Sequence, residues 1–437
     1  MYMIVTSSLI YLLAFIYPKY LYVGVYLWML PLVVTDKDND YGFKEGLVWG
    51  LIFFGGHLVW FASIVYGKGK GDTRMLIYLA TAGYYSLFSG FWLWLKQLLV
   101  YRWVLKTKTL KGEYVASWCT WIISTAIFIY LTCYCSLAIV DCFEGYPFIN
   151  PLLLLVSWNW YLRPICYFGS LYYWIVIIMI NLILSKLVIK YDTNSLIFLV
   201  LLLFFPVLFQ PPEVLSEFID DEIAYLKPTW NDMDLTQAQK FYQISRQIDY
   251  LVLGSPDIKY IVIPESGFPH DLLAWESRLH VWTSLFTKDT SILIGAHRRC
   301  ESKVYNCLYQ IDSDGKIVAW YDKSHLMAFV ERIPWVFRKI SIFANLFTQD
   351  DAVFSYPAQD QEDISIVGCR PYICSELFFE AKRPVRDRPI VFICNDSWIG
   401  LPYARDLAKR SAQLYSLRYQ VPILYVGSYD CEIITTI

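Results

Sequence analysis

The sequence predicts a protein of two parts, a polytopic α-helical membrane domain over residues 1–210 and an α/β domain over residues 229–437. Of the 437 residues, 57% are hydrophobic and only 17% are charged, which is too apolar for a soluble protein of this length. From about Pro228 onward, short apolar strands alternate with helical segments, as in sheets covered by helices. These two observations place a membrane domain before a water-soluble one.

Seven apolar runs fill the first part and predict about seven transmembrane helices. A bilayer core about 30 Å thick needs about 20 apolar residues per helix, and the third to sixth runs meet that length. The first two runs are short and are separated by Tyr17-Pro18-Lys19-Tyr20, so they form a tight helical hairpin, or a signal-anchor-like helix followed by a second helix. The runs are 3–17, 20–35, 45–66, 76–100, 115–140, 167–189 and 194–210.

Basic residues in the short loops predict the orientation of these helices. With the N-terminus inside, the inner loops (36–44, 101–114 and 186–193) carry eight Lys and Arg residues, and the outer loops carry five. The second part of the chain is therefore expected outside the cytoplasm. The stretch 144–163 is either a re-entrant or interfacial piece on the outer face or an ordinary loop. Lys96, near the end of the fourth run, is expected to extend its ammonium group to the membrane interface.

Composition changes at Gln210-Pro211-Pro212, where acidic residues follow at once, so residues 211–228 are predicted to be a linker. Beyond it, Asp314-Gly315 between two apolar runs indicates a β-hairpin. The predicted strands are 260–263, 291–296, 304–311, 316–321, 364–374, 390–395 and 423–426, and the predicted helices are 232–253, 278–287 and 403–419.

Two classes of site are not expected. The net charge of −2 gives no reason to predict nucleic-acid binding. The 11 cysteines show neither CxxC pairs nor a Cys/His ligand spacing, so no disulfide framework, metal site or cofactor is predicted.

Three reactive side chains each follow an apolar strand: Glu265, Lys323 and Cys374. A carboxylate at the end of a buried strand loses solvation, which suits a general base. An ammonium group fixed in a site can stabilise an oxyanion, and the amide of Ser375 is expected to point at the same oxyanion. A thiol beside a cation is a nucleophile that can be acylated. Each signal alone is weak, since a single cysteine at a strand end is usually a core residue.

The order Glu–Lys–Cys resembles that of the carbon–nitrogen hydrolase (nitrilase) superfamily, and nearly the whole chain resembles its membrane branch, the apolipoprotein N-acyltransferases. The resemblance implies a nitrilase-like αββα sandwich. The motifs that carry it are Pro264-Glu265, Tyr321-Asp322-Lys323-Ser324-His325-Leu326, Phe329, Glu331 with Pro334, Ile373-Cys374-Ser375-Glu376, Asn395-Asp396-Ser397-Trp398-Ile399-Gly400, and the glycines and aromatics of residues 46–60.

By this resemblance Glu265 is the base, Lys323 the oxyanion cation and Cys374 the nucleophile of a thioester mechanism. Glu331 would position Lys323 and the substrate, Glu376 would support the nucleophile, and Trp398 would line the lipid approach. A surface position is the alternative for Glu331 and for Glu376. The implied partners are a phospholipid acyl donor and an amine acceptor, the N-terminal cysteine of a lipoprotein, at a bacterial inner (plasma) membrane with the nitrilase-like domain on the periplasmic side.

The chain departs from the family pattern in three places. Ser375 stands where the family has Tyr, Tyr415-Ser416-Leu417-Arg418 replaces an Arg-Ala-x-Glu pattern, and Gly427-Ser428-Tyr429-Asp430 replaces an Asn-Gly stretch. The family's final strands and last transmembrane helix are expected to be missing, as in shortened conjugal-transfer-type relatives. Two alternatives therefore stay open, namely an amidase or acyltransferase with another substrate, for example in conjugal transfer, and a non-catalytic membrane scaffold.

Overall fold

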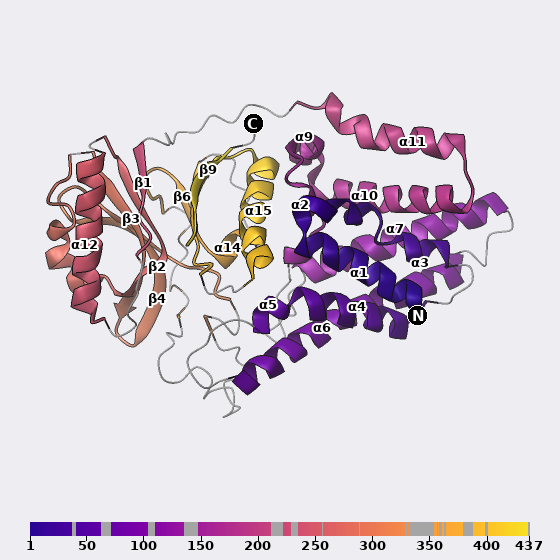
Figure 1. Ribbon diagram of the computed structural model, residues 1–437, viewed down its shortest axis with the longest axis horizontal. Coiled ribbons are helices and arrows are strands. Elements are labelled where there is room, and N and C mark those ends of the chain that lie inside the picture. Colours follow the sequence, from indigo (N-terminus) through magenta and orange to yellow (C-terminus); the bar gives the residue numbers. More distant parts are fainter. Residues whose placement is uncertain are drawn as a thin grey trace. The chain divides into compact units, whose positions relative to one another are not determined.

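The chain folds into two compact units, which we call the helical unit (Met1–Ser136, Glu144–Pro212 and Ile399–Arg418) and the α/β unit (Leu137–Phe143, Glu213–Trp398 and Tyr419–Ile437). Their elements are labelled on the ribbon of the computed structural model (Figure 1). The structure describes residues 1–36, 41–62, 71–103, 110–134, 147–210, 222–228, 235–255, 257–287, 289–327, 331–332, 354–355, 357, 361, 364–378, 388–397 and 401–435.

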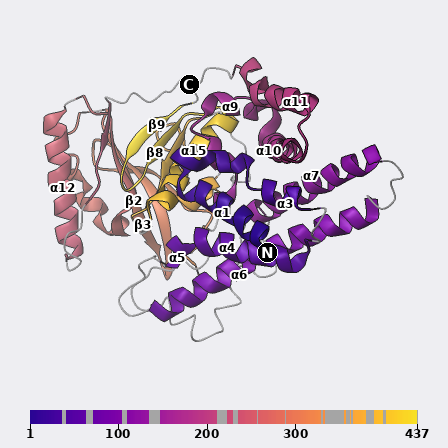
Figure 2. The same cartoon turned by 45° about the vertical axis from the view of Figure 1, so that its right-hand side comes forward.

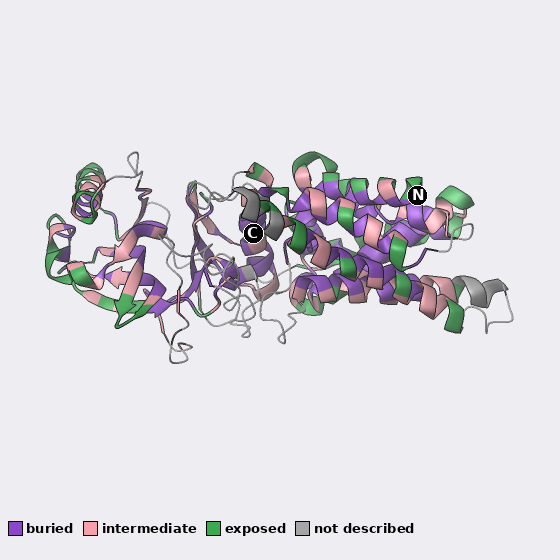
Figure 3. Ribbon diagram, turned by 90° about the horizontal axis from the view of Figure 1, so that it is seen from below, coloured by how far each residue is buried: buried purple, intermediate pink, exposed green. Residues whose placement is uncertain are grey.

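The helical unit is built from helices of very different length, seen from two directions in Figures 1 and 2. Buried residues gather between them and exposed apolar residues lie on their outer sides (Figure 3). The elements are α1 (Tyr2–Ile16), α2 (Pro18–Leu21), η1 (Tyr22–Tyr26), α3 (Leu30–Val34), α4 (Phe43–His57), α5 (Val59–Ala62), α6 (Gly71–Trp103), α7 (Leu110–Tyr134), η3 (Pro147–Ile149), α8 (Leu152–Leu155), α9 (Asn159–Leu162), α10 (Ile165–Ile189), α11 (Thr193–Phe204), η4 (Phe205–Leu208) and α15 (Pro402–Tyr419).

Among the described residues, two helical stretches are long and apolar enough to cross a membrane, Val115–Tyr134 and Ile165–Ile189. A third would be the pair Tyr2–Ile16 and Pro18–Val34, which is bent by 118°. The bend falls at Tyr17–Pro18 and favours the hairpin alternative. The expectation of about seven spans stays a prediction.

Glycines bring α4 and α6 into close contact. A Cβ atom at Gly46 would lie 2.1 Å from the carbonyl oxygen of Ser89, and one at Gly50 would lie 2.7 Å from Cα of Ser86. Small residues at such positions let two helix backbones approach each other, a common way of packing helices in membranes.

The described part of the stretch 144–163 is not an exposed loop. It forms the short elements η3, α8 and α9, and the four leucines of α8 are all buried. Asn150 fixes it, because its Oδ1 accepts hydrogen bonds from the amide of Leu152 (3.1 Å) and from Nε1 of Trp174 on α10 (3.1 Å). A piece of short helices packed inside the unit fits the re-entrant alternative.

Lys96 does not extend to an interface. Its side chain is 6% exposed and forms an ion pair with Asp36, whose other carboxylate oxygen accepts a hydrogen bond from Nε1 of Trp121 (3.2 Å). The indole ring also lies 5.0 Å from the ammonium group. The partly buried carboxylate of Asp36 satisfies the lysine inside the unit, so the expectation from the sequence is wrong.

The α/β unit contains two sheets. The first runs β1 (Ile223–Tyr225), β2 (Tyr260–Asp271), β3 (Ser291–Cys300), β4 (Lys303–Ile311) and β5 (Ile317–Asp322); β1, β2 and β3 are parallel, and β4 and β5 follow as antiparallel hairpins. The second runs β6 (Arg370–Ile373), β7 (Ile390–Ile393), β8 (Ile423–Val426) and β9 (Cys431–Ile434), with only β9 antiparallel. Helix α12 (Gln237–Gly254, Figure 1) and the 3₁₀ helix η6 (Leu273–Val281) pack against one face of the first sheet.

The two sheets face each other across one hydrophobic core. Val262, Leu293 and Leu308 of the first sheet pack in one cluster with residues of the second, among them Ile373, Val391, Ile393, Leu424 and Val426. A second cluster on the other face of the first sheet binds α12 through Phe241, Ile244 and Ile248. These helix–sheet–sheet layers confirm the α/β part of the predicted fold class.

Several element boundaries differ from the sequence prediction. β1 lies inside the expected linker 211–228, and β9 was not predicted. The α12 helix begins only at Gln237, because Thr236 caps it by accepting a hydrogen bond from the amide of Gln239 (3.3 Å). β6 begins at Arg370, because Val367 and Gly368 adopt positive φ angles and form a turn.

The predicted helix 403–419 exists as α15 and belongs to the helical unit, within which Tyr403 and Arg410 form hydrogen bonds. The Tyr403 hydroxyl donates to the carbonyl of His57 (2.7 Å). Arg410, which is buried, bonds to Asp406 (2.6 Å) and donates to the carbonyl of Leu153 (3.1 Å).

Candidate active site

Three strands position the predicted reactive residues, but Glu265 lies inside β2, which continues to Asp271, and not at the strand end that the sequence predicts. Glu265 follows the buried residues Ile261–Ile263 of β2, at the point where the regular pairing with β3 is interrupted. On β3, a Cβ atom at position 295 would lie 2.5 Å from Cα of Glu265, so glycine is needed there. Lys323 directly follows β5 and Cys374 directly follows β6.

The backbone turns sharply at Cys374. Its amide still donates to the carbonyl of Ile393 on β7 (2.8 Å), but its φ angle is +50°. Such a conformation is costly for a residue with a Cβ atom and is concentrated at functional sites. The strand therefore ends at the thiol, and α14 (Ser375–Phe378) begins at once.

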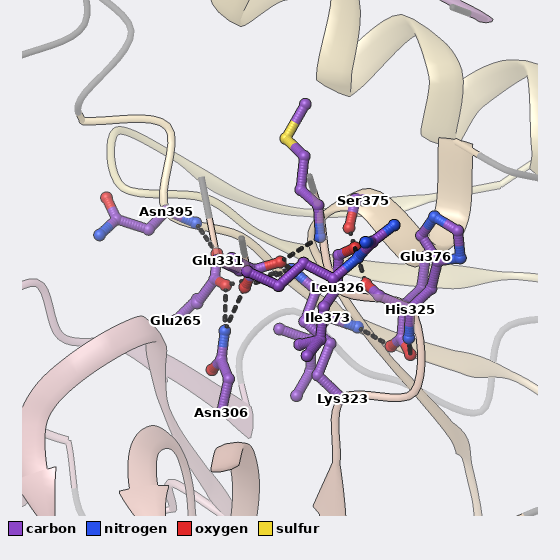
Figure 4. A network of polar contacts seen from close by, with 12 residues as sticks. Glu265, Asn306, Lys323, His325, Leu326, Glu331, Ile373, Ser375, Glu376 and Asn395 are labelled. Atoms are coloured by element: carbon purple, nitrogen blue, oxygen red, sulfur yellow. Dashed lines mark hydrogen bonds and ion pairs between the residues drawn. The ribbon is translucent and has the colours of Figure 1, made fainter. Parts of the chain in front are cut away.

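One buried cluster contains Lys323, Glu331 and Glu265 (Figure 4). The Lys323 ammonium lies 2.8 Å from Oε2 and 2.9 Å from Oε1 of Glu331. It lies 3.6 Å from Oε1 of Glu265. The Cys374 thiol lies close enough to this cluster for the charges of both carboxylates and of the lysine to act on its pKa. The structure thus brings the three predicted residues together.

Asn306 on β4 belongs to this cluster, although sequence reasoning missed it. Its side-chain nitrogen donates to Oε1 of Glu265 (2.7 Å) and to Oε1 of Glu331 (2.9 Å). The backbone amide of Asn395, after β7, donates to Oε2 of Glu265 (2.7 Å). The signal in the sequence is slight, since Asn306 is a polar residue within the apolar run 304–311.

Glu376 connects the lysine loop to the end of β6. Its Oε1 accepts hydrogen bonds from the amides of Ser324 (2.6 Å) and His325 (3.1 Å) and from the Tyr321 hydroxyl (2.8 Å). Its Oε2 accepts from the amide of Ile373 (2.8 Å). Glu376 therefore ties the residues after Lys323 to the residue before Cys374.

Both Glu331 and Glu376 are buried, 7% and 3% exposed, so the alternative of surface carboxylates is wrong. Ser375 is buried as well, and its hydroxyl donates to the carbonyl of His325 (3.0 Å). Trp398, the remaining predicted residue, lies outside the described residues.

Asp322 anchors the lysine from the preceding position. Its carboxylate accepts two hydrogen bonds from Arg298 on β3, at 3.0 and 2.5 Å. Its backbone amide and carbonyl bond to the side chain of Gln361, at 2.8 and 2.6 Å. The backbone at Lys323 is thus held from two sides.

The electrostatics follow from burial and crowding. Burial raises the pKa of Glu265, and the neighbouring Lys323 offsets only part of this effect. Burial alone would lower the pKa of Lys323, but the negative charges around it, above all that of Glu331, raise it overall. Burial and then the charge of Glu265 raise the pKa of the Cys374 thiol. The resting site therefore combines a protonated thiol, a firmly charged ammonium and a carboxylate of increased basicity.

No group of His, Cys, Asp and Glu side chains within the described part of the chain could hold a metal ion. What the cluster can do chemically is move a proton from the thiol to Glu265 while Lys323 holds a developing negative charge.

Comparison with known proteins gives sequence relatives of one kind. No family model matches the chain. The chain is 27% identical over 199 residues to "Apolipoprotein N-acyltransferase" of Rhodopseudomonas palustris, covering 43% of this chain and 37% of that protein. It is 26% identical over 188 residues to the protein of the same name from Bradyrhizobium diazoefficiens, covering 39% and 34%. The matched part thus spans little more than a third of these relatives.

Solved structures with low similarity include the carbon–nitrogen hydrolase from Helicobacter pylori (13% identity, TM-score 0.33, 47% of this chain and 72% of that chain). Another is the NitFhit protein of Caenorhabditis elegans (16% identity, TM-score 0.33, 47% and 50%). The sequence similarity agrees with the motifs: over about two-fifths of its length the chain is similar to proteins named apolipoprotein N-acyltransferase.

Proposed function

We propose that the protein is a membrane N-acyltransferase that moves an acyl chain from a phospholipid to Cys374 and then to an amine, the N-terminal cysteine of an apolipoprotein. The observation that carries this proposal is that the half-buried Cys374 lies beside the buried Glu265 and Lys323, close enough for their charges to act on its thiol. The names of the sequence relatives and the apolar helices add the lipid context.

The first half-reaction acylates the thiol. Glu265 takes the proton of Cys374 as its sulfur attacks the ester carbonyl carbon of the phospholipid. Lys323, with the amide of Ser375, stabilises the negative charge on the carbonyl oxygen. The carbon–oxygen bond then breaks, and the departing oxygen takes the proton from Glu265. The products are a lysophospholipid and a thioester on Cys374.

The second half-reaction repeats these steps with an amine. The amine nitrogen attacks the thioester carbon, and Glu265 accepts the proton that the nitrogen loses. Cys374 leaves as the carbon–sulfur bond breaks and recovers the proton from Glu265. The product is an amide, and the enzyme returns to its starting state.

The location of both substrates determines where the acyl transfer takes place. The donor is a phospholipid and the acceptor a lipoprotein, so both substrates are expected at the bilayer, where a chain with apolar helices can meet them. With the predicted orientation, the α/β unit lies on the periplasmic side of the inner membrane.

The test is a mass measurement of the purified protein after incubation with phospholipid. The expected result is an adduct of one acyl chain on Cys374, lost on addition of an amine acceptor and absent in Cys374→Ala. An equal adduct on Cys374→Ala would overturn the thioester mechanism. Failure of the gene to rescue a strain without its own lipoprotein acyltransferase, with an adduct present, would point to another acceptor.

A further inference from the structure

Four buried side chains form a closed ring of polar contacts: Glu265, Asn306, Glu331 and Lys323 (Figure 4). Asn306 and Lys323 lie on opposite sides of the ring, and each contacts both carboxylates. Asn306 is 2% exposed, and its side-chain nitrogen has two hydrogens, one for each carboxylate. The asparagine thus acts as a neutral counterpart to the lysine.

The lysine does not serve the two carboxylates equally. Its ammonium contacts both oxygens of Glu331, at 2.8 and 2.9 Å, but stays 3.6 Å from Glu265. The close hydrogen bonds of Glu265 come instead from uncharged donors, namely the side chain of Asn306 (2.7 Å) and the amide of Asn395 (2.7 Å). Each oxygen of Glu265 therefore has one neutral donor.

We propose that Asn306 is a positioning residue that keeps Glu265 ionised and apart from Glu331, so that Glu265 alone receives the proton of Cys374; this rests on the proposed function. The physical reason is that two carboxylates close to one cation compete for it, and one of them is then readily protonated. A donor shared between them removes this competition without adding a charge. The backbone supports the arrangement, because the carbonyl of Asn306 accepts a hydrogen bond from the amide of Lys323 (2.8 Å).

The residue type follows from the geometry. An aspartate at position 306 has the same shape but would place a third carboxylate in the ring, and a leucine would offer no donor. A serine could donate to only one carboxylate. The series Asn306→Ser, Asn306→Leu and Asn306→Asp is therefore expected to weaken the ionised form of Glu265 in increasing order.

The test measures alkylation of Cys374 by iodoacetamide as a function of pH, followed by mass spectrometry of the full-length protein in detergent. This reaction reports activation of the thiol and needs no lipid or amine. In the wild type we expect the alkylation rate to fall at low pH, where Glu265 becomes protonated; this fall is the low-pH limb of the curve. In Asn306→Leu the limb is expected to shift to higher pH by about one to two pH units, because a hydrogen bond to a buried charged group has been lost. Below the limb, alkylation then falls by about 10- to 100-fold, and well above it the rates of wild type and variant converge.

The matched control is Gln361→Met. Gln361 bonds to the backbone of Asp322 and to neither carboxylate in the ring, so its loss is expected to slow alkylation by a similar factor at every pH. A limb that stays in place in all three Asn306 variants, with a uniform loss of rate as in the control, overturns the proposal. A variant that does not fold is judged by its melting temperature, and Asn306→Ser, the mildest change, then carries the test.

The two proposals fail in different ways. If the limb moves as expected but no acyl adduct forms with phospholipid, the role of Asn306 holds and the acyl donor is wrong. If the adduct forms and the limb stays in place, acyl transfer holds and Asn306 is only a structural residue.

Discussion

The two units each contain a buried lysine, and the two lysines differ in their charge balance. In the helical unit, Lys96 has one carboxylate, Asp36, and an indole beside it. In the α/β unit, Lys323 is 1% exposed and faces the carboxylates of Glu331 and Glu265 together with a thiol. One cluster is neutral as it stands, whereas the other has more acidic groups than one cation can satisfy.

This difference separates a structural pair from a reactive site. A buried ion pair with matched charges holds its helices in register and has no spare capacity for a proton. A cluster with one acidic group too many must keep a proton on one of its members, and that proton can be moved. Departures from local satisfaction that persist in a folded protein are most common at functional sites.

The largest expected effect comes from removing the cation of the unbalanced cluster. Lys323→Met leaves two buried carboxylates without an ammonium group, so we expect a loss of about 3–5 kcal/mol in unfolding free energy and no measurable acyl adduct on Cys374. Chemical denaturation and mass spectrometry measure the two effects. Lys323→Arg keeps the charge and is expected to restore most of the stability but little of the adduct, because the planar group cannot occupy the same point. Adduct formation at the wild-type rate in Lys323→Met would contradict the assigned role.

The corresponding change in the balanced pair is expected to act on stability alone. Lys96→Met leaves the partly buried Asp36 without its cation and is expected to cost about 3 kcal/mol, seen as a lower melting temperature in detergent. In Lys96→Met with Asp36→Asn, both charges are gone, and most of the loss is expected to be recovered. If the double variant is no more stable than Lys96→Met, the lost stability does not come from the unpaired charge of Asp36.

The pH dependence is a smaller effect with a definite sign. Because the pKa of Glu265 is raised in the folded protein, its contribution to stability is present at low pH and is lost as pH rises from the usual glutamate value of 4.5 through the folded one. The slope is at most about 1.4 kcal/mol per pH unit. Glu265→Gln is expected to lack this slope in denaturation curves. The rate of thiol acylation changes in the opposite direction, since it needs the ionised form and falls as pH falls.

Sequence reasoning found the reactive residues because each comes directly after a run of apolar residues. The runs before Glu265, Lys323 and Cys374 predict strands. β5 and β6 end just before Lys323 and Cys374, whereas β2 continues past Glu265 to Asp271. Glu331 and Glu376 came only from the family resemblance, because a carboxylate in an irregular segment has no periodic pattern around it. Asn306 was missed because its partners are 41 and 25 residues away in the sequence.

The fold shows the same difference between features that depend on neighbouring residues and features that depend on distant ones. β8 was predicted with its observed bounds, because Ile423–Val426 is a short apolar run with turn residues beyond it. β9 was missed, since Cys431–Ile434 is only half-buried and gains its order by pairing with β8. The buried position of Lys96 also depends on a partner 60 residues away, which a local pattern does not show.

The smallest effect concerns the support of the unbalanced cluster. Tyr321→Phe removes the hydroxyl that donates to Glu376 (2.8 Å) and leaves the three backbone amides that hold this carboxylate. We expect a loss of about 1 kcal/mol in unfolding free energy and a fall of a few-fold in the acylation rate, measured by denaturation and by adduct formation over time.

Tyr309→Phe is the matched control, because its hydroxyl makes only a long contact with the carbonyl of His297 (3.4 Å) and touches no member of the cluster. It is expected to leave the acylation rate unchanged. Equal losses of rate in the two tyrosine variants would mean that a general disturbance of the first sheet causes the loss. The hydrogen bond to Glu376 would then not be needed to hold the loop after Lys323. A loss confined to Tyr321→Phe would instead place Glu376 among the groups that keep the lysine and the thiol in register.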